Sequence, residues 1–138
     1  MAKKLLSVID LGDFTWKEKL ASLFSIEDWH YVGSSTDPIA PAFENSWANV
    51  GGTGIPDAAF YKDTYDRVHL RGNVDTGATT NTIFTLPTGY RPPYKTIQTT
   101  YNNGGGVVYI TVDTDGTVDP AFGAGTDMWL DGVSFRVN

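Results

Sequence analysis

The chain of 138 residues contains no cysteine. It therefore has no disulfide framework and no thiolate metal site, and its fold does not depend on the redox state of its compartment. A chain of this length forms one domain with a core large enough to fold without such cross-links. We expect no cofactor.

Basic residues are also few. Lys and Arg number 10 against 16 Asp and Glu, which gives a formal net charge of −6. Most of the acidity lies after residue 28, where six basic residues face eleven acids. Since no basic stripe is present to neutralise phosphates, we expect no nucleic-acid partner. The acidic surface mainly aids solubility.

Long apolar runs are missing as well. The start, "MAKKLLSVIDLGDF", has two lysines before an apolar patch, as a signal peptide would. Asp10 and Asp13 interrupt that patch, however, and no small-residue cleavage site follows. No segment is long enough to cross a bilayer, so we expect no membrane insertion and a mature protein made in a cytoplasm.

Residues 1–28 form a predicted N-terminal arm that differs from the rest of the chain. In "DFTWKEKLASLFSIED", Thr15 and Glu18 have the spacing of a capping box, which predicts a short helix. Four large apolar residues at helical spacing form a stripe along this helix: Trp16, Leu20, Leu23 and Phe24. This stripe either covers an edge of the same domain or anchors the chain on a sister subunit or a larger assembly.

Residues 29–138 have the pattern of an all-β head domain. Fifteen glycines, seven prolines and many threonines favour strands and turns. Eight short strands at fairly regular spacing predict an antiparallel β-sandwich or jelly roll. The predicted strands span residues 29–33, 58–63, 66–75, 81–87, 95–101, 106–113, 116–120 and 128–138.

No catalytic or metal site is expected. The two histidines lie inside predicted strands, no serine near them has a nucleophile-elbow context, and no two of the sixteen acids stand out as a glycosidase pair. The segment "DTDGTVD" lacks the glycine and glutamate positions of an EF-hand loop. It predicts instead a hairpin with a type I′ turn at Asp115–Gly116. We therefore expect a protein that is not an enzyme.

Aromatic residues in or beside the predicted loops leave two interpretations open. Exposed rings beside amide and carboxylate groups suit the stacking and hydrogen bonding that sugars require, whereas the same rings could simply plug the ends of the sandwich. Trp47 and Tyr61 belong to this set. The candidates for glycan contact are Tyr65, Tyr90, Tyr94 and Tyr101.

The order of several motifs resembles a domain that recurs at the C-terminal end of bacteriophage tail-fibre, minor tail and other virion proteins. The most specific pieces are "FENSWAN" at residues 43–49, "DRVHLRG" at 66–72 and "FTLPTGYRP" at 84–92. "VYITVDTDGTV" and "WLDGVSFR" follow in the same order, so that the resemblance covers residues 29–138.

The resemblance implies a β-sandwich head, commonly trimeric, displayed on a virus particle. In the loop "AFENSWANVGG", Phe43 and Trp47 would be buried anchors, and Asn45 and Asn49 would tie the irregular backbone by hydrogen bonds. Polar residues on a central strand would either lie at the subunit interface of a homotrimer or simply meet water. These residues are His69, Arg71 and Asn73.

Such heads normally end long fibres, whereas about 28 residues precede the head here. We therefore expect the arm to attach the protein to phage capsid or tail proteins, at the virion surface, after assembly in the host cytoplasm. The favoured interpretation is a small capsid decoration or head-fibre protein. The alternative is a tail-tip or tail-fibre receptor-binding protein that binds host cell-surface glycans.

Overall fold

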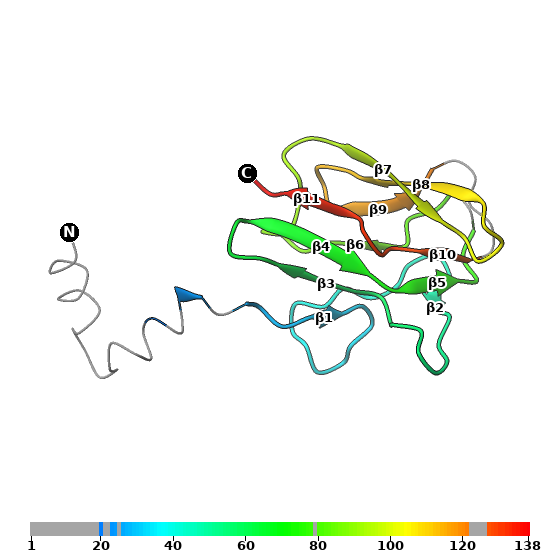
Figure 1. Ribbon diagram of the computed structural model, residues 1–138, viewed down its shortest axis with the longest axis horizontal. Coiled ribbons are helices and arrows are strands. Elements are labelled where there is room, and N and C mark those ends of the chain that lie inside the picture. The colour runs from blue at the N-terminus through cyan, green and yellow to red at the C-terminus, as the bar shows by residue number, and fades with distance from the viewer. Residues whose placement is uncertain (1–19, 21–22, 25, 79, 122–126) are drawn as a thin grey trace, which may run out of the picture.

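The computed structural model describes residues 20, 23–24, 26–78, 80–121 and 127–138 (Figure 1). Eleven strands are present in these residues. They are β1 (His30–Tyr31), β2 (Ala48–Asn49), β3 (Ala59–Lys62), β4 (Arg67–Arg71), β5 (Asn73–Asp75), β6 (Phe84–Thr85), β7 (Thr96–Tyr101), β8 (Val107–Val112), β9 (Thr117–Pro120), β10 (Asp127–Trp129) and β11 (Ser134–Arg136).

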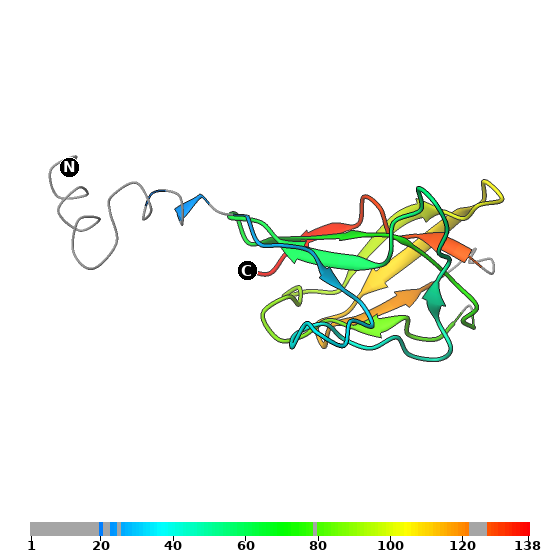
Figure 2. The ribbon, with the colours of Figure 1, turned by 90° about the horizontal axis from the view of Figure 1, so that it is seen from below.

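The strands form three antiparallel sheets arranged as a sandwich. Their orders are β1-β3-β4-β11, β10-β5-β2 and β6-β9-β8-β7. The first two sheets share one layer, because β4 runs on into β5 and a short turn joins β10 to β11 (Figure 1). Figure 2 shows this layer facing the third sheet. The predicted all-β class with an antiparallel β-sandwich is confirmed.

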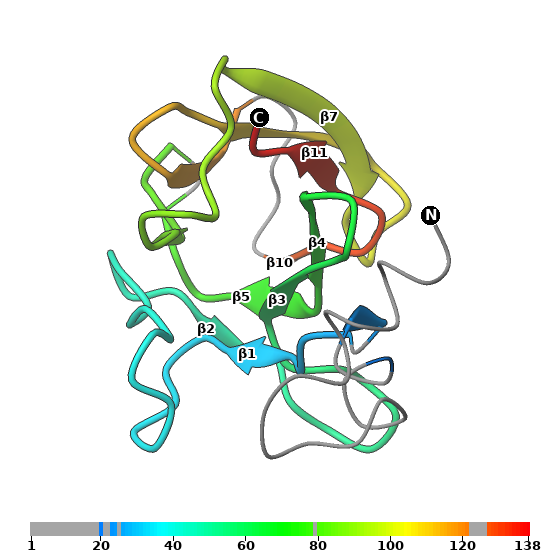
Figure 3. The same ribbon diagram turned by 90° about the vertical axis from the view of Figure 1, so that its left-hand side faces the viewer.

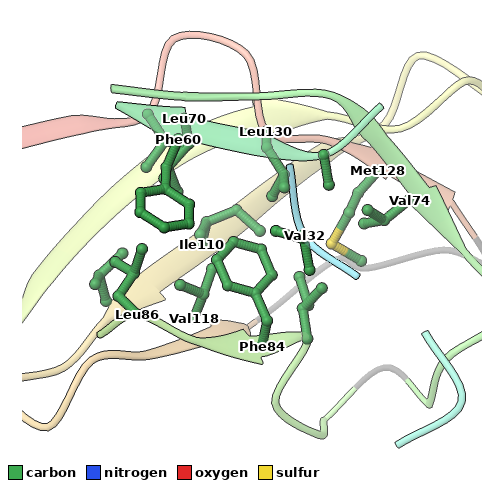
Figure 4. Close-up of a cluster of buried hydrophobic side chains, with 14 of the residues drawn as sticks. Val32, Phe60, Leu70, Val74, Phe84, Leu86, Ile110, Val118, Met128 and Leu130 are labelled. Carbon is green, nitrogen blue, oxygen red and sulfur yellow. The ribbon is translucent and has the colours of Figure 1, made fainter. Parts of the chain in front are cut away.

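One continuous apolar core fills the space between the layers. Phe60 and Leu70 enter it from the first layer, and Phe84, Ile110 and Val118 enter it from the third sheet (Figure 4). Alternation along β4 and β8 produces this arrangement, since every second side chain points to the same face. Each such side chain stabilises the fold by about 1.5–3 kcal/mol when fully buried.

Gly72 interrupts the long strand that the sequence predicts over residues 66–75. Its φ is +115°, and a Cβ at this position would lie 2.5 Å from the backbone N and Cα of Ala58. Only glycine tolerates both conditions. Strict alternation therefore ends here, and Asn73 and Val74 are both fully buried.

The predicted C-terminal strand over residues 128–138 is also two strands. A turn separates β10 from β11, with a hydrogen bond from Val133 N to Leu130 O of 3.2 Å. Gly132 in this turn has a φ of +85°. The predicted alternation beyond it holds, since Phe135 is buried and Arg136 is exposed.

The hairpin predicted between β8 and β9 is present, but its turn type is wrong. A type I′ turn at Asp115–Gly116 requires a positive φ at both residues, and only Gly116 has one, at +95°. Hydrogen bonds from Gly116 N to Asp113 O (2.9 Å) and from Asp113 N to Thr117 O (3.0 Å) close a three-residue loop. This is a type I turn followed by a glycine bulge.

Candidate binding surfaces

The loop over residues 40–52 is held to the sandwich by Trp47. Its side chain is 3% exposed, and its Nε1 donates to Asn81 O at 3.0 Å. The indole lies directly against Gly77, where a Cβ would come within 2.0 Å of the ring. Trp47 thus fills a space that its neighbours leave for it, and its ring has no free face to offer a ligand.

The two asparagines of this loop bond to backbone groups. Asn45, in the left-handed region with φ of 51°, donates from Nδ2 to Thr82 O at 2.9 Å. Asn49 accepts the Ala58 N–H at 2.7 Å. Phe43 is half-buried and packs against the core. These contacts give the loop a structural role in joining the two layers.

His30 lies between two carboxylates at the point where the chain enters the head. Its Nδ1 is 2.6 Å from Asp37 Oδ2, and its Nε2 is 2.7 Å from Glu27 Oε1. Because ionised carboxylates only accept hydrogen bonds, a ring nitrogen that bonds to one of them carries the proton of that bond. The hydrogen bond from His30 is the main reason that the pKa of Asp37 is lowered.

Tyr90 completes this group from the loop after β6. Its hydroxyl donates to Glu27 Oε1 at 2.7 Å, and its ring packs edge-on against Phe60 with centroids 5.1 Å apart. Burial, followed by the bond to Glu27, raises the pKa of Tyr90. Of the four tyrosines proposed for glycan contact, Tyr90 therefore packs as part of the head.

His69 belongs to a cluster on the outer face of the β1-β3-β4-β11 sheet. Its ring stacks on Tyr61 at 4.9 Å, with 15° between the planes, and its Nε2 is 2.7 Å from Asp63 Oδ2. The hydrogen bond from His69 lowers the pKa of Asp63. Tyr61 also meets Trp29 edge-on at 4.6 Å.

Arg71 lies on the same face, and Asn73 does not. The guanidinium of Arg71 lies over the Trp29 ring at 4.1 Å and donates to Tyr31 Oη at 2.7 Å. Asn73 is fully buried and donates to Asn103 Oδ1 at 3.2 Å. Of the three residues proposed for a subunit interface, His69 and Arg71 remain candidates, whereas the bulge at Gly72 turns Asn73 inward.

The remaining tyrosine candidates are exposed, and they lie at different ends of the head. Tyr65, at the turn between β3 and β4, is 81% exposed, and Tyr94, just before β7, is 80% exposed. Tyr101, 61% exposed, ends β7 at the opposite tip of that strand. In the end-on view of Figure 3, β7 lies beside β11. Gln98 joins these strands through two hydrogen bonds to the Ser134 backbone.

An open surface pocket of about 190 Å³ lies where the segment leading into β7 meets β11. Its lining is mostly apolar and includes two cations, Lys95 and Arg136. Pro92, Pro93, Tyr94, Lys95, Thr96, Phe135, Arg136 and Asn138 line it. We call it the Tyr94 pocket.

The described part of the predicted N-terminal stripe is not covered by the head. Leu23 and Phe24 are 59% and 74% exposed, and the neighbouring Ile26 is 67% exposed. Leu20 is half-buried. Trp16 and most of the predicted helix lie outside the described residues. The trace through these residues, blue in Figures 1 and 2, leaves the sandwich beside β1.

Neither a metal centre nor a spanning helix appears in the described ranges. Within residues 26–78, 80–121 and 127–138, no three His, Asp or Glu side chains are grouped so that they could hold a metal ion. Among the residues whose placement is described, no helix has the length and apolar character needed to cross a bilayer.

These features define an antiparallel β-sandwich head that presents exposed aromatic residues at its ends. No family model and no curated protein matches the chain. Among solved structures, it is similar to the crystal structure of the receptor binding protein (gp15) of Listeria phage PSA. The TM-score is 0.64 at 17% sequence identity, and the match covers 97% of this chain and 74% of the other. This similarity shows a shared fold.

Proposed function

We propose that the chain is a bacteriophage virion protein whose β-sandwich head binds a receptor on the host cell surface. The observation that carries the proposal is the fold shared with a phage receptor binding protein over nearly the whole chain. Of the two interpretations left open by the sequence, this observation favours receptor binding over capsid decoration.

The chemistry of the exposed side chains supports a glycan as the receptor. Tyr65 and Tyr94 present their rings to solvent almost completely, which an aromatic residue with a packing role does not do. Aromatic rings of this kind are adapted to the apolar faces of sugars.

Attachment to the particle is assigned to the N-terminal segment. Leu23, Phe24 and Ile26 lie exposed beside the head, and large apolar side chains in a row are stabilised by a partner surface. The partner is a protein of the phage tail or capsid. A location on the capsid stays a prediction, which immunogold labelling of virions would test.

No enzymatic activity is part of this proposal. His30 contacts two carboxylates and His69 contacts one, in arrangements that tie strands and loops together. Incubation of the purified protein with host glycans should release no reducing ends above the background rate.

A homotrimer remains a prediction, with His69 and Arg71 near the subunit contact. Light scattering at micromolar concentration should give three times the chain mass of 15.0 kDa. A mass of one chain would exclude the trimer at that concentration.

Cell binding tests the proposed function directly. The fluorescently labelled full chain should bind saturably to bacteria that the phage infects, and soluble surface glycan from these cells should compete. Cells whose surface sugars have been oxidised with periodate serve as the control. Equal binding to oxidised and intact cells would contradict a glycan receptor, and binding to neither would contradict receptor binding.

A further inference from the structure

We propose that the Tyr94 pocket binds an anionic saccharide, a sugar that carries a phosphate or a carboxylate. The inference rests on the proposed function, since it names the chemistry of the receptor and the place on the head where it binds.

The shape of the pocket fits one sugar-sized group. Its volume of about 190 Å³ is below the ~300–1,000 Å³ of sites that enclose drug-sized ligands. Pro92, Pro93 and the buried Phe135 line it with apolar surface, and Tyr94 stands beside them 80% exposed. A sugar ring placed there would meet the aromatic face of Tyr94 with its C–H groups.

The charge around the pocket calls for an anion. Arg136, which lines it, lies directly opposite Arg67 in the register of β11 and β4. Like charges in such cross-strand positions destabilise a sheet. In the part of the chain that the structure describes, neither guanidinium forms an ion pair; Arg67 donates to Ser134 Oγ and Arg136 to Asn138 Oδ1. A bound phosphate or carboxylate would relieve this repulsion, and guanidinium groups suit both.

The carboxylates that contact pocket residues do not cancel this charge. Asp113 is paired with Lys95 at 3.1 Å, and Asp66 accepts a hydrogen bond from Asn138 Nδ2 at 3.0 Å. Lys95 is thus engaged by Asp113, and Arg136 is the pocket-lining cation that has no ion pair among the described residues.

The β3–β4 turn extends the surface beyond the pocket. Val137 N donates to Asp66 O at 3.0 Å, which brings this turn against the C-terminal residues (Figure 1). Tyr65, next to Asp66, is 81% exposed at this same end of the head. A longer glycan that enters the Tyr94 pocket could therefore continue over Tyr65.

The test is a titration of the full ¹⁵N-labelled chain, followed by NMR. The probes are N-acetylglucosamine 1-phosphate, glucuronic acid, neutral N-acetylglucosamine and inorganic phosphate. We expect at least one acidic sugar to shift the amides of residues 94–96 and 134–138, and to bind at least tenfold more tightly than the neutral sugar and inorganic phosphate. The first two probes distinguish a phosphate from a carboxylate. No binding, shifts confined to other residues, or equal binding of the neutral sugar or of phosphate alone would overturn the proposal.

Matched variants locate the site. Arg136→Gln should weaken binding of the acidic sugar at least tenfold, and Arg136→Lys should recover part of it. Tyr94→Ser should also weaken it, whereas Val107→Ser, at the far end of β7 and β8, should leave it unchanged. All four side-chain changes are at exposed positions, so the melting temperatures should stay close to that of the wild type. Equal losses in Tyr94→Ser and Val107→Ser would overturn the assignment.

Cell binding separates this inference from the proposed function. If Arg136→Gln and Tyr94→Ser bind host cells as well as the wild type does, the pocket is not the receptor site, and the proposed function stands. If the wild type binds the acidic sugar in the pocket but binds no cells, the site stands and the proposed function fails.

Discussion

Replacement of Trp47 by alanine tests whether the irregular loop over residues 40–52 is structural. The indole is 3% exposed, lies against Gly77 and donates to Asn81 O. Truncation of a buried Trp to Ala typically costs about 3–5 kcal/mol. Small domains unfold with a free energy of about 5–15 kcal/mol, so the variant should lose a large part of its stability. At about 2–8 °C per kcal/mol, its melting temperature should fall by at least roughly 6 °C.

The assay is urea unfolding followed by fluorescence and circular dichroism, with calorimetry for the melting temperature. Trp47→Phe keeps much of the buried area and loses the bond to Asn81, so it should cost clearly less than Trp47→Ala. Tyr65→Ala, at a side chain 81% exposed, is the control and should change the stability by no more than about 0.5 kcal/mol. A melting temperature of Trp47→Ala within about 3 °C of the wild type would refute the structural role of Trp47. The loop over residues 40–52 would then again be a candidate binding site.

Three further predictions concern Gly72, the two histidine–aspartate pairs and the exposed apolar residues of the N-terminal segment. Gly72→Ala should lower the free energy of unfolding, measured in urea, by at least about 2 kcal/mol, because the φ of Gly72 is +115° and the new Cβ would meet Ala58. The control Gly104→Ala, at an exposed glycine without a positive φ, should be nearly neutral. Hydrogen bonds from His30 and His69 hold the pKa values of Asp37 and Asp63 below 3.8, so their contribution to stability is present above pH 3.8 and is lost as the pH falls through the folded-state pKa values. The melting temperature should therefore fall more steeply with decreasing pH below 3.8 in the wild type than in the double variant Asp37→Asn/Asp63→Asn. Equal slopes of melting temperature against pH would contradict this. Leu23→Ser/Phe24→Ser should keep the wild-type melting temperature within about 2 °C yet reduce incorporation into virions, whereas Ile39→Ser in the head should not reduce it; normal incorporation of the double variant would exclude the anchor.

Local pattern was enough to predict the strands whose two faces differ clearly. Along β4, the alternation of Val68 and Leu70 with His69 places the first two in the core. The same holds for the C-terminal residues, where Val133 and Phe135 are buried and Arg136 is exposed. Period-2 alternation is sufficient in these places because each strand has one core face and one solvent face.

The interruptions of those strands depend on tertiary contacts that the pattern does not contain. The break at Gly72 exists because the backbone of Ala58 passes too close for a Cβ, and Ala58 lies 14 residues earlier in the chain. In the sequence alone, Gly72 is simply a glycine between Arg71 and Asn73. Strict alternation therefore predicts Asn73 on the polar face, and the structure buries it.

The sequence pattern also does not distinguish aromatic residues that pack in the head from those that are exposed to solvent. Tyr90 and Tyr94 are four residues apart in one proline-containing loop. Tyr90 packs on Phe60 and bonds to Glu27, whereas Tyr94 is 80% exposed beside the pocket. Tyr90 and Tyr94 differ in their packing because the N-terminal segment and β11 contact this loop only in the folded chain. Arg136 gave no signal of a site because its cross-strand partner Arg67 is distant in sequence.

The most direct test of the account is binding of the labelled full chain to host bacteria and to phage-resistant mutants of the same strain that lack surface glycans. We predict saturable binding to the parent cells, with at least a tenfold loss on the glycan-deficient mutants and a similar loss when Tyr94 is changed to Ser in the protein. Undiminished binding to the mutants, or no binding to the parent cells, would contradict the claim that this head recognises a host surface glycan.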